Sequence, residues 1–217
     1  MFKALFGGGQ GATLLEAAFD DITTMLDQGA KMLDHALAAL FDNESLPVDL
    51  DTMDDVIDDS ERMVRRTVLK HLTVNPQQDL VASLILVSMV QDAERIGDFA
   101  RGLADLSDLT GATLEGSPAE ELRSLADRLR PLFEVCERAF REDDAAGAIQ
   151  VVSTHTELKQ AFTDFVRHIA RSDLPTDKAV AFALAAGSLR RISSHLSNIA
   201  STVTQPYDRI RHGDEEA

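Results

Sequence analysis

Apolar residues recur along this chain at the spacing of one helix face, in six long segments. In the first segment Leu15, Ile22, Met25 and Leu33 belong to one such stripe. The pattern predicts helices over residues 12–41, 49–72, 77–109, 118–141, 144–171 and 177–204. No alternating pattern of useful length predicts a strand. The fold class predicted is therefore all-α.

Glycine, proline and capping residues divide these segments. Gly111–Gly116 is the clearest linker. After it, Ser117 and Glu120 have the spacing of a capping box, and Pro118 stands at the first helical position. Pro131 should kink the fourth helix, because it removes a backbone donor and clashes with the preceding turn.

The two halves of the chain resemble each other. Ala93–Phe99, late in the third helix, and Leu189–His195, late in the sixth, both contain Arg-Ile at the same place, at an offset of about 96 residues. This indicates two pseudo-repeated three-helix bundles with six helices in all. The expected organisation is a leader at 1–11, a first repeat at 12–110, a linker at 111–117, a second repeat at 118–206 and a tail at 207–217.

Composition narrows the function. Of 217 residues, 37 are acidic and 21 are Lys or Arg, which gives a formal net charge of −16. Nucleic-acid binding needs a basic surface, so DNA and RNA are excluded as expected partners. Neither a signal-peptide pattern nor an apolar run of about 18 residues occurs, so we expect a cytoplasmic protein.

Glu94 and Asp98 are four residues apart on one predicted helix. Two like charges at that spacing destabilise a helix by roughly 0.2–0.5 kcal/mol. The positive charges of Arg95 and Arg101 could offset this repulsion at the surface. A bound hard cation could also do so, because such ions take carboxylate oxygens.

The second predicted helix carries a dense acidic cluster. Its members are Asp51, Asp54, Asp55, Asp58, Asp59 and Glu61. Asp51, Asp55, Asp58 and Asp59 follow helical spacing on one face. Such a run is also typical of a solvated surface, and early acids favour the helix dipole.

The segment Glu94-Arg95-Ile96-Gly97-Asp98 resembles the Glu-x-x-x-Asp signature of the PhoU family, with its usual Arg-Ile-Gly filling. It falls late in the third helix, after a proline-containing turn, as in that family. Ile192–Val203 resembles the second copy, with His195 and Asn198 in place. The resemblance extends from about Leu14 to Ile210.

The resemblance implies a regulatory protein of phosphate uptake built as two side-by-side three-helix bundles. Such proteins couple a phosphate ABC transporter to a membrane sensor histidine kinase, or accompany sodium–phosphate cotransporters. It also implies a metal site in which Asp55, Asp58 or Asp59 faces Glu94 and Asp98. The metal is undecided among iron, zinc, nickel, magnesium and calcium.

The second copy departs from the family pattern. Arg190 stands where the family has Glu, and Ser194 where it has Asp. An arginine has no lone pair to donate, so an equal second metal site is not expected. Arg190 and Arg191, with His195, instead form a candidate contact for an anion or an acidic partner. Ordinary surface arginines and a packed or solvated histidine are the alternatives.

An enzyme is not expected. No histidine has a Glu three residues before it, as a di-iron bundle requires, and Cys136 is interpreted as packing. The alternative to a metal-binding regulator is a metal-free structural protein, or one associated with a sodium–phosphate cotransporter. A homodimer is also predicted. Met25, Met32 and Leu33 are then either part of its apolar edge or simply core.

Overall fold

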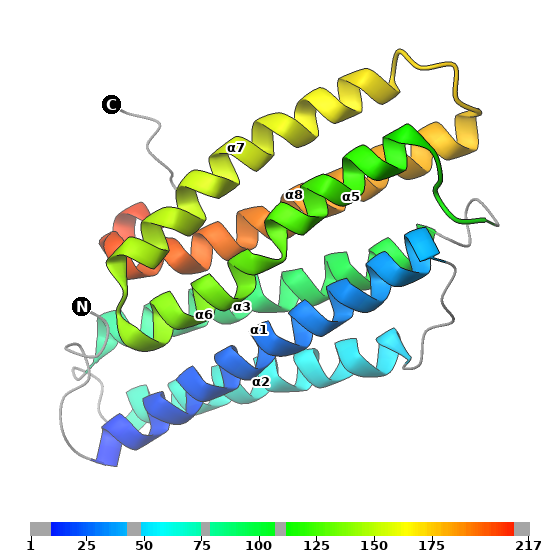
Figure 1. Ribbon diagram of the computed structural model, residues 1–217. Helices are drawn as coiled ribbons and strands as arrows, with labels where there is room; N and C mark the ends of the chain where they lie inside the picture. Colours follow the sequence, from blue (N-terminus) through cyan, green and yellow to red (C-terminus); the bar gives the residue numbers. More distant parts are fainter. Residues whose placement is uncertain (1–9, 43–48, 75–78, 107–111, 211–217) are drawn as a thin grey trace.

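Helices are the only regular elements among the described residues of the computed structural model, which confirms the all-α prediction (Figure 1). The described residues are 10–42, 49–74, 79–106 and 112–210. Residues 1–9 of the predicted leader, the proline-containing turn at Asn75-Pro76, the first residue of the linker and residues 211–217 of the tail lie outside them. Gln10 and Gly11, predicted as the end of the leader, belong to the first helix.

One side of the molecule is built from three packed helices, α1 (Gln10–Asp42), α2 (Leu50–Val74) and α3 (Leu80–Ala104). The stripe predicted for α1 is its buried stripe. Met25, Met32 and Leu33 are all within it, so they are core residues and not an exposed edge. A homodimer stays a prediction without that edge to support it.

The helix α2 buries only a narrow apolar stripe, which includes Ile57, Val64 and Val68. The rest of the helix is strongly polar, and removing those charges from water would be unfavourable. For this reason α2 lies at the edge of the molecule with its acidic residues near or at the surface (Figure 1).

The other side consists of α5 (Ser117–Leu129), α6 (Pro131–Glu142), α7 (Ala145–Ile169) and α8 (Thr176–Thr204). The single kinked helix predicted over 118–141 is thus two helices. They separate at Arg130, because the ring of Pro131 cannot donate the next helical hydrogen bond. Counting the pair as one element gives the six helices that were predicted.

The predicted capping box is wrong. Ser117 is already helical, and the N-cap of α5 is Gly116, with a φ of 85° that suits glycine. The carbonyl of Gly116 accepts from the amides of Ala119 and Glu120, and no side chain caps this end. Pro118 does lie in the first turn, as expected.

The two sets of helices meet where α3 lies beside α8 (Figure 1). Many buried residues of both helices are small, which lets the two backbones approach closely. They include Ala82, Ala93, Ala100, Ala185, Ala186 and Ala200. Buried side chains from the seven α-helices of the described ranges form one continuous core. The residue bounds proposed for two repeats stay a prediction.

None of the helices within the described ranges combines the length and apolar character that a bilayer crossing requires.

Gly97 lies at a close contact between α3 and α2. A Cβ at this position would lie 2.8 Å from Ile57 Cδ1 and 3.1 Å from Asp54 Oδ1. We expect Gly97→Val to lower the free energy of unfolding by about 1–3 kcal/mol, because it overpacks this contact. Gly102→Val is the matched control, since a Cβ there meets nothing within 4 Å. Urea denaturation of both variants tests this, and equal stabilities would contradict it.

Candidate functional site

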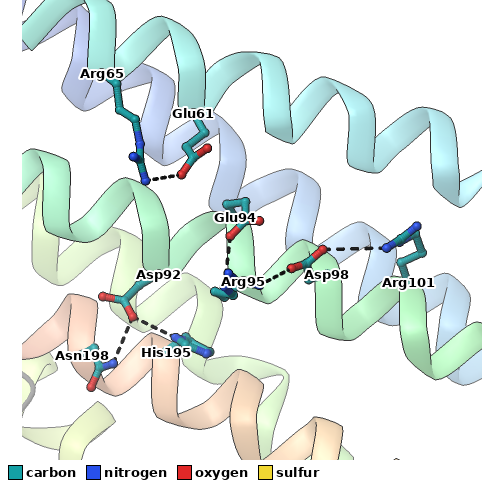
Figure 2. A network of polar contacts seen from close by, with 9 residues as sticks. All are labelled: Glu61, Arg65, Asp92, Glu94, Arg95, Asp98, Arg101, His195 and Asn198. Atoms are coloured by element: carbon teal, nitrogen blue, oxygen red, sulfur yellow. Dashed lines mark hydrogen bonds and ion pairs between the residues drawn. The ribbon is translucent and has the colours of Figure 1, made fainter.

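Glu94 and Asp98 lie on the part of α3 that borders α2 (Figure 2). Their side chains retain 16% and 29% of their exposure, so both are within reach of solvent but partly covered. Gly97, packed on Ile57, brings this turn of α3 against α2. The sequence prediction that these two carboxylates share one helix face is consistent with their positions.

Two arginines of α3 neutralise Asp98. Arg95 Nη1 donates to Asp98 Oδ2 at 2.8 Å, and Arg101 Nη2 lies 3.9 Å from Asp98 Oδ1 (Figure 2). Arg95 Nε also lies 3.5 Å from Glu94 Oε2. The local relief of repulsion considered from the sequence is therefore present, and it acts mainly on Asp98.

Glu94 is a partly buried acid with other carboxylates near it. Burial first, then the charges of Asp98, Glu61 and Asp58, raise its pKa to about 7, against the opposing effect of Arg95. Because burial is the largest cause, the fold favours the protonated, neutral form of Glu94. The neighbouring carboxylates of α2 are themselves paired, Glu61 with Arg65 at 2.6 Å and Asp58 with Arg62 at 3.2 Å.

Asp54 is the buried acid of α2. Its carboxylate lies 3.0 Å from Arg101 Nε, and Arg101 also donates to Asp51 at 3.4 Å. Burial raises the pKa of Asp54, although the Arg101 guanidinium opposes this. Arg101 thus ties α2 to α3 beside the Glu94 turn.

Of the three acids predicted to face Glu94 and Asp98, only Asp58 is close enough to affect the Glu94 charge. Asp55 and Asp59 are exposed on α2, and Asp59 accepts from Arg62 Nη1 at 2.6 Å. Arg62 also donates to Asp58 at 3.2 Å.

Asp54 and Glu61 belong to the acidic cluster recognised in the sequence but were not among the predicted site residues. Together with Asp58 they follow the i, i+4, i+7 spacing that borders the buried stripe of Ile57 and Val64. Choosing acids by their distance from that apolar stripe would have identified them. Choosing acids by their density selected Asp55 and Asp59 instead.

The chemistry of these donors fits a hard divalent cation, because all are carboxylates. The side-chain geometry does not yet provide a site. In the described part of the chain, no three His, Cys, Asp or Glu residues gather closely enough to hold a metal ion. The metal therefore stays a prediction for this face.

A second polar cluster joins α3 to α8. Asp92 Oδ1 lies 2.8 Å from His195 Nδ1 and accepts from Asn198 Nδ2 at 3.0 Å (Figure 2). The His195 ring also stacks on Phe99, with centroids 5.7 Å apart. His195 is thus partly packed, and Asp92 was not singled out from the sequence because it stands in an apolar stretch.

Arg190 and Arg191 are exposed on α8. Both line a cavity of about 250 Å³ together with His155, Lys159, Ser194 and His195. The guanidinium of Arg191 lies over the Phe99 ring, 5.6 Å from its centroid. The structure brings the three predicted contact residues of the second half together and adds residues of α7 to them.

Cys136 is fully buried, which confirms its interpretation as a packing residue. Burial raises the pKa of its thiol to about 12, so it is a protonated thiol at neutral pH and a poor nucleophile.

Comparison with known proteins finds a family to which part of the chain is similar. Residues 22–106 match the model of the PhoU family, described as a PhoU domain. No curated protein matches the chain.

Two solved structures share the fold. The crystal structure of PhoU from Pseudomonas aeruginosa aligns with a TM-score of 0.80 and 23% identity, covering 89% of this chain and 97% of that one. The crystal structure of the phosphate transport system regulatory protein PhoU from Streptococcus pneumoniae aligns with a TM-score of 0.78 and 18% identity, covering 89% and 95%.

The raised pKa of Glu94 makes stability depend on pH. Its ordinary pKa of 4.5 becomes about 7 in the fold, so between these values the folded chain holds a proton that the unfolded chain has released. This contribution to stability is lost as pH rises from 4.5 to 7. We expect Glu94→Gln to exceed the wild type in stability at pH 8, by on the order of 1–3 kcal/mol, and to lose most of that advantage at pH 4.5.

Urea denaturation at the two pH values measures this difference. Glu142→Gln, at an exposed position at the end of α6, is the control and should differ little from the wild type at either pH. A Glu94→Gln effect of equal size at both pH values would contradict the assignment.

Proposed function

This chain belongs to the PhoU family, and from that premise we propose that it is a regulatory accessory protein of phosphate uptake and phosphate-starvation signalling. It acts by contact with a phosphate transporter, a sensor histidine kinase, or both, and not by catalysis. The observation that carries the proposal is the extent of the likeness. The PhoU domain match is joined by a shared fold over 89% of the chain.

The acidic face of α2 and α3 supports contact with membrane proteins on their cytoplasmic side. We define this acidic face by Asp55, Asp58, Asp59, Glu94 and Asp98. Cytoplasmic loops of membrane proteins carry an excess of Lys and Arg. A protein with a net charge of −16 and such a face is complementary to these loops, which favours both the rate and the orientation of association. The proposed location is accordingly the cytoplasm.

Capture from membranes tests this role. The tagged full chain is incubated with detergent-solubilised membranes of its own organism, grown in high and in low phosphate, and bound proteins are identified by mass spectrometry. We expect a phosphate ABC transporter, a sodium–phosphate cotransporter or a sensor histidine kinase to be captured. The identity of the captured transporter also decides between the two transport systems.

The acidic face is tested in the same experiment. Asp55→Lys/Asp59→Lys should reduce capture at least about tenfold, because it reverses charge where the basic loops would dock. The matched control is Asp27→Lys/Asp164→Lys, which changes the net charge equally at exposed positions on α1 and α7. Capture of neither a transporter nor a kinase in either growth condition would overturn the proposal.

We also propose that the acidic face takes up a divalent cation at Glu94 and Asp98, with Asp58 nearby. The carboxylates of Asp98, Glu61 and Asp58, whose charges all act on Glu94, support this. Arg95 and Arg101 are nearly half exposed, so the ion pairs that now occupy Asp98 are of the weak surface kind that a divalent cation can replace.

Thermal unfolding with added Mg²⁺ or Mn²⁺ tests the cation proposal at pH 7.5. We expect saturable stabilisation of the wild type, because the ion binds the folded chain only. Glu94→Gln/Asp98→Asn should abolish it, whereas the control Asp27→Asn/Asp164→Asn should retain it. An unchanged Tm in the wild type would favour the metal-free alternative and would leave the proposed partner contact untouched.

A further inference from the structure

Arginines on the surface of this chain are commonly paired with carboxylates, as its excess of acids leads one to expect. Arg123 contacts Asp42 at 2.7 Å, and Arg128 contacts Glu157 at 2.7 Å. In such a pair the carboxylate neutralises the positive charge of the arginine. A group of cations that lacks them in so acidic a protein is therefore an unusual feature.

Lys159, Arg190 and Arg191 form that group. None of the three has an ion pair with a carboxylate within the residues described here, yet all line the same cavity between α7 and α8. The other lining residues are His155, Ser194 and His195. We call this cavity the basic pocket. No acidic residue is among those that line it.

The positive charges of the basic pocket act on one another. The pKa of His155 is lowered to about 4, first by burial and then by Lys159 and Arg190. The ring of His155 is therefore neutral at physiological pH. Like charges held together without a counter-ion are unfavourable, and an anion in the pocket would relieve them.

The basic pocket lies where the first half has its acidic motif. At an offset of about 96 residues Arg190 corresponds to Glu94, and Ser194 corresponds to Asp98. On α7, His155 and Lys159 stand beside Arg190, as Asp58 and Glu61 on α2 stand near Glu94. At the first motif position the acidic side chain of the first half, Glu94, is thus replaced by a basic one, Arg190, in the second half.

The donors of the basic pocket suit a tetrahedral oxyanion. Two guanidinium groups, an ammonium group and the Ser194 hydroxyl supply many hydrogen-bond donors. A cavity of about 250 Å³ is smaller than the roughly 300–1,000 Å³ of pockets for drug-sized ligands, so a small ion fits it better.

His155 gives the basic pocket a way to distinguish phosphate from sulfate. Its Nδ1 lies 2.9 Å from Ser193 Oγ, and Ser193 donates its own proton to the Arg190 carbonyl at 2.8 Å. Nδ1 must then be the protonated nitrogen, which leaves Nε2 as an acceptor. Phosphate at neutral pH retains a proton that can be donated to such an acceptor, whereas sulfate has none.

From this arrangement we propose that the basic pocket binds a phosphate group, with Lys159, Arg190 and Arg191 as charge partners, Ser194 as a donor and His155 favouring phosphate over sulfate. The ligand is free inorganic phosphate or a phosphoryl group on a larger molecule, and both share this chemistry. The inference rests on the pocket alone. It does not depend on the proposed regulatory contacts.

Isothermal titration of the full chain at pH 7.5 and constant ionic strength tests the proposal. The probes are inorganic phosphate, O-phosphoserine and sulfate. We expect saturable binding of inorganic phosphate that is at least about tenfold tighter than that of sulfate. Tighter binding of O-phosphoserine than of inorganic phosphate would identify a phosphoryl group on a larger molecule as the ligand. Binding of neither phosphate probe above sulfate overturns the proposal.

Variants locate the binding. Arg190→Gln/Arg191→Gln should weaken phosphate binding at least about tenfold, because it removes charge-assisted hydrogen bonds. These side chains are exposed and make no ion pairs in the described chain, so the fold should persist, as circular dichroism would verify. Arg66→Gln/Arg171→Gln removes two equally exposed cations elsewhere and should leave binding unchanged. Equal loss in both double variants would mean non-specific attraction and would overturn the assignment.

Discussion

The buried carboxylate of Asp92 fixes how the two sides of the molecule fit together. It is 3% exposed in the contact between α3 and α8, and a buried carboxylate needs hydrogen-bond partners. His195 and Asn198 provide them from adjacent positions on α8, three residues apart. A shift of α8 along α3 would separate both partners from Asp92 at once. A hydrogen bond to a charged group contributes roughly 1.5–3 kcal/mol, so these two bonds favour one register.

That register places two opposite charge clusters close to each other. The acidic face lies where α3 meets α2, and the basic pocket lies where α8 meets α7. Arg95, which contacts Glu94 and Asp98, lines a cavity of about 280 Å³ that is also bordered by Arg191 and His195. Phe99 separates the two clusters, with the His195 ring stacked on it and Arg191 above its face.

The fold could be predicted from the sequence because the spacing of apolar residues indicates where helices form. The stripes of α1 and α2 gave these elements to within a few residues, and Pro131 marked the break between α5 and α6. The candidate site was less accessible. Asp55 and Asp59 were chosen from a run of acids, but the direction of each side chain depends on where the narrow stripe of α2 meets α3.

Contacts between side chains that are far apart in the sequence could not be predicted, for a different reason. Asp92 and His195 are in hydrogen-bond contact although 103 residues separate them in the sequence. The local sequence pattern of neither helix identifies the partner residue. The same holds for the basic pocket, since His155 and Lys159 join Arg190 only when α7 packs on α8. The start of α5 shows that a local prediction can also fail. Ser117 has a side chain suited to capping a helix, but Gly116 takes the N-cap position because glycine readily adopts the positive φ that this turn requires.

The chemistry of the acidic face depends on which carboxylates Arg95 and Arg101 contact. Arg95 and Arg101 both act on Asp98, and Arg101 is shared with Asp54 and Asp51 on α2. Glu94 therefore receives only the longer 3.5 Å contact from Arg95 while facing three carboxylates. Any ligand that brings positive charge gains most at Glu94, whether it is a proton, a divalent cation or a basic side chain of a partner. If the proposed cation and partner contacts both use Glu94, a proton, a divalent cation and a basic side chain of the partner would compete for this one carboxylate.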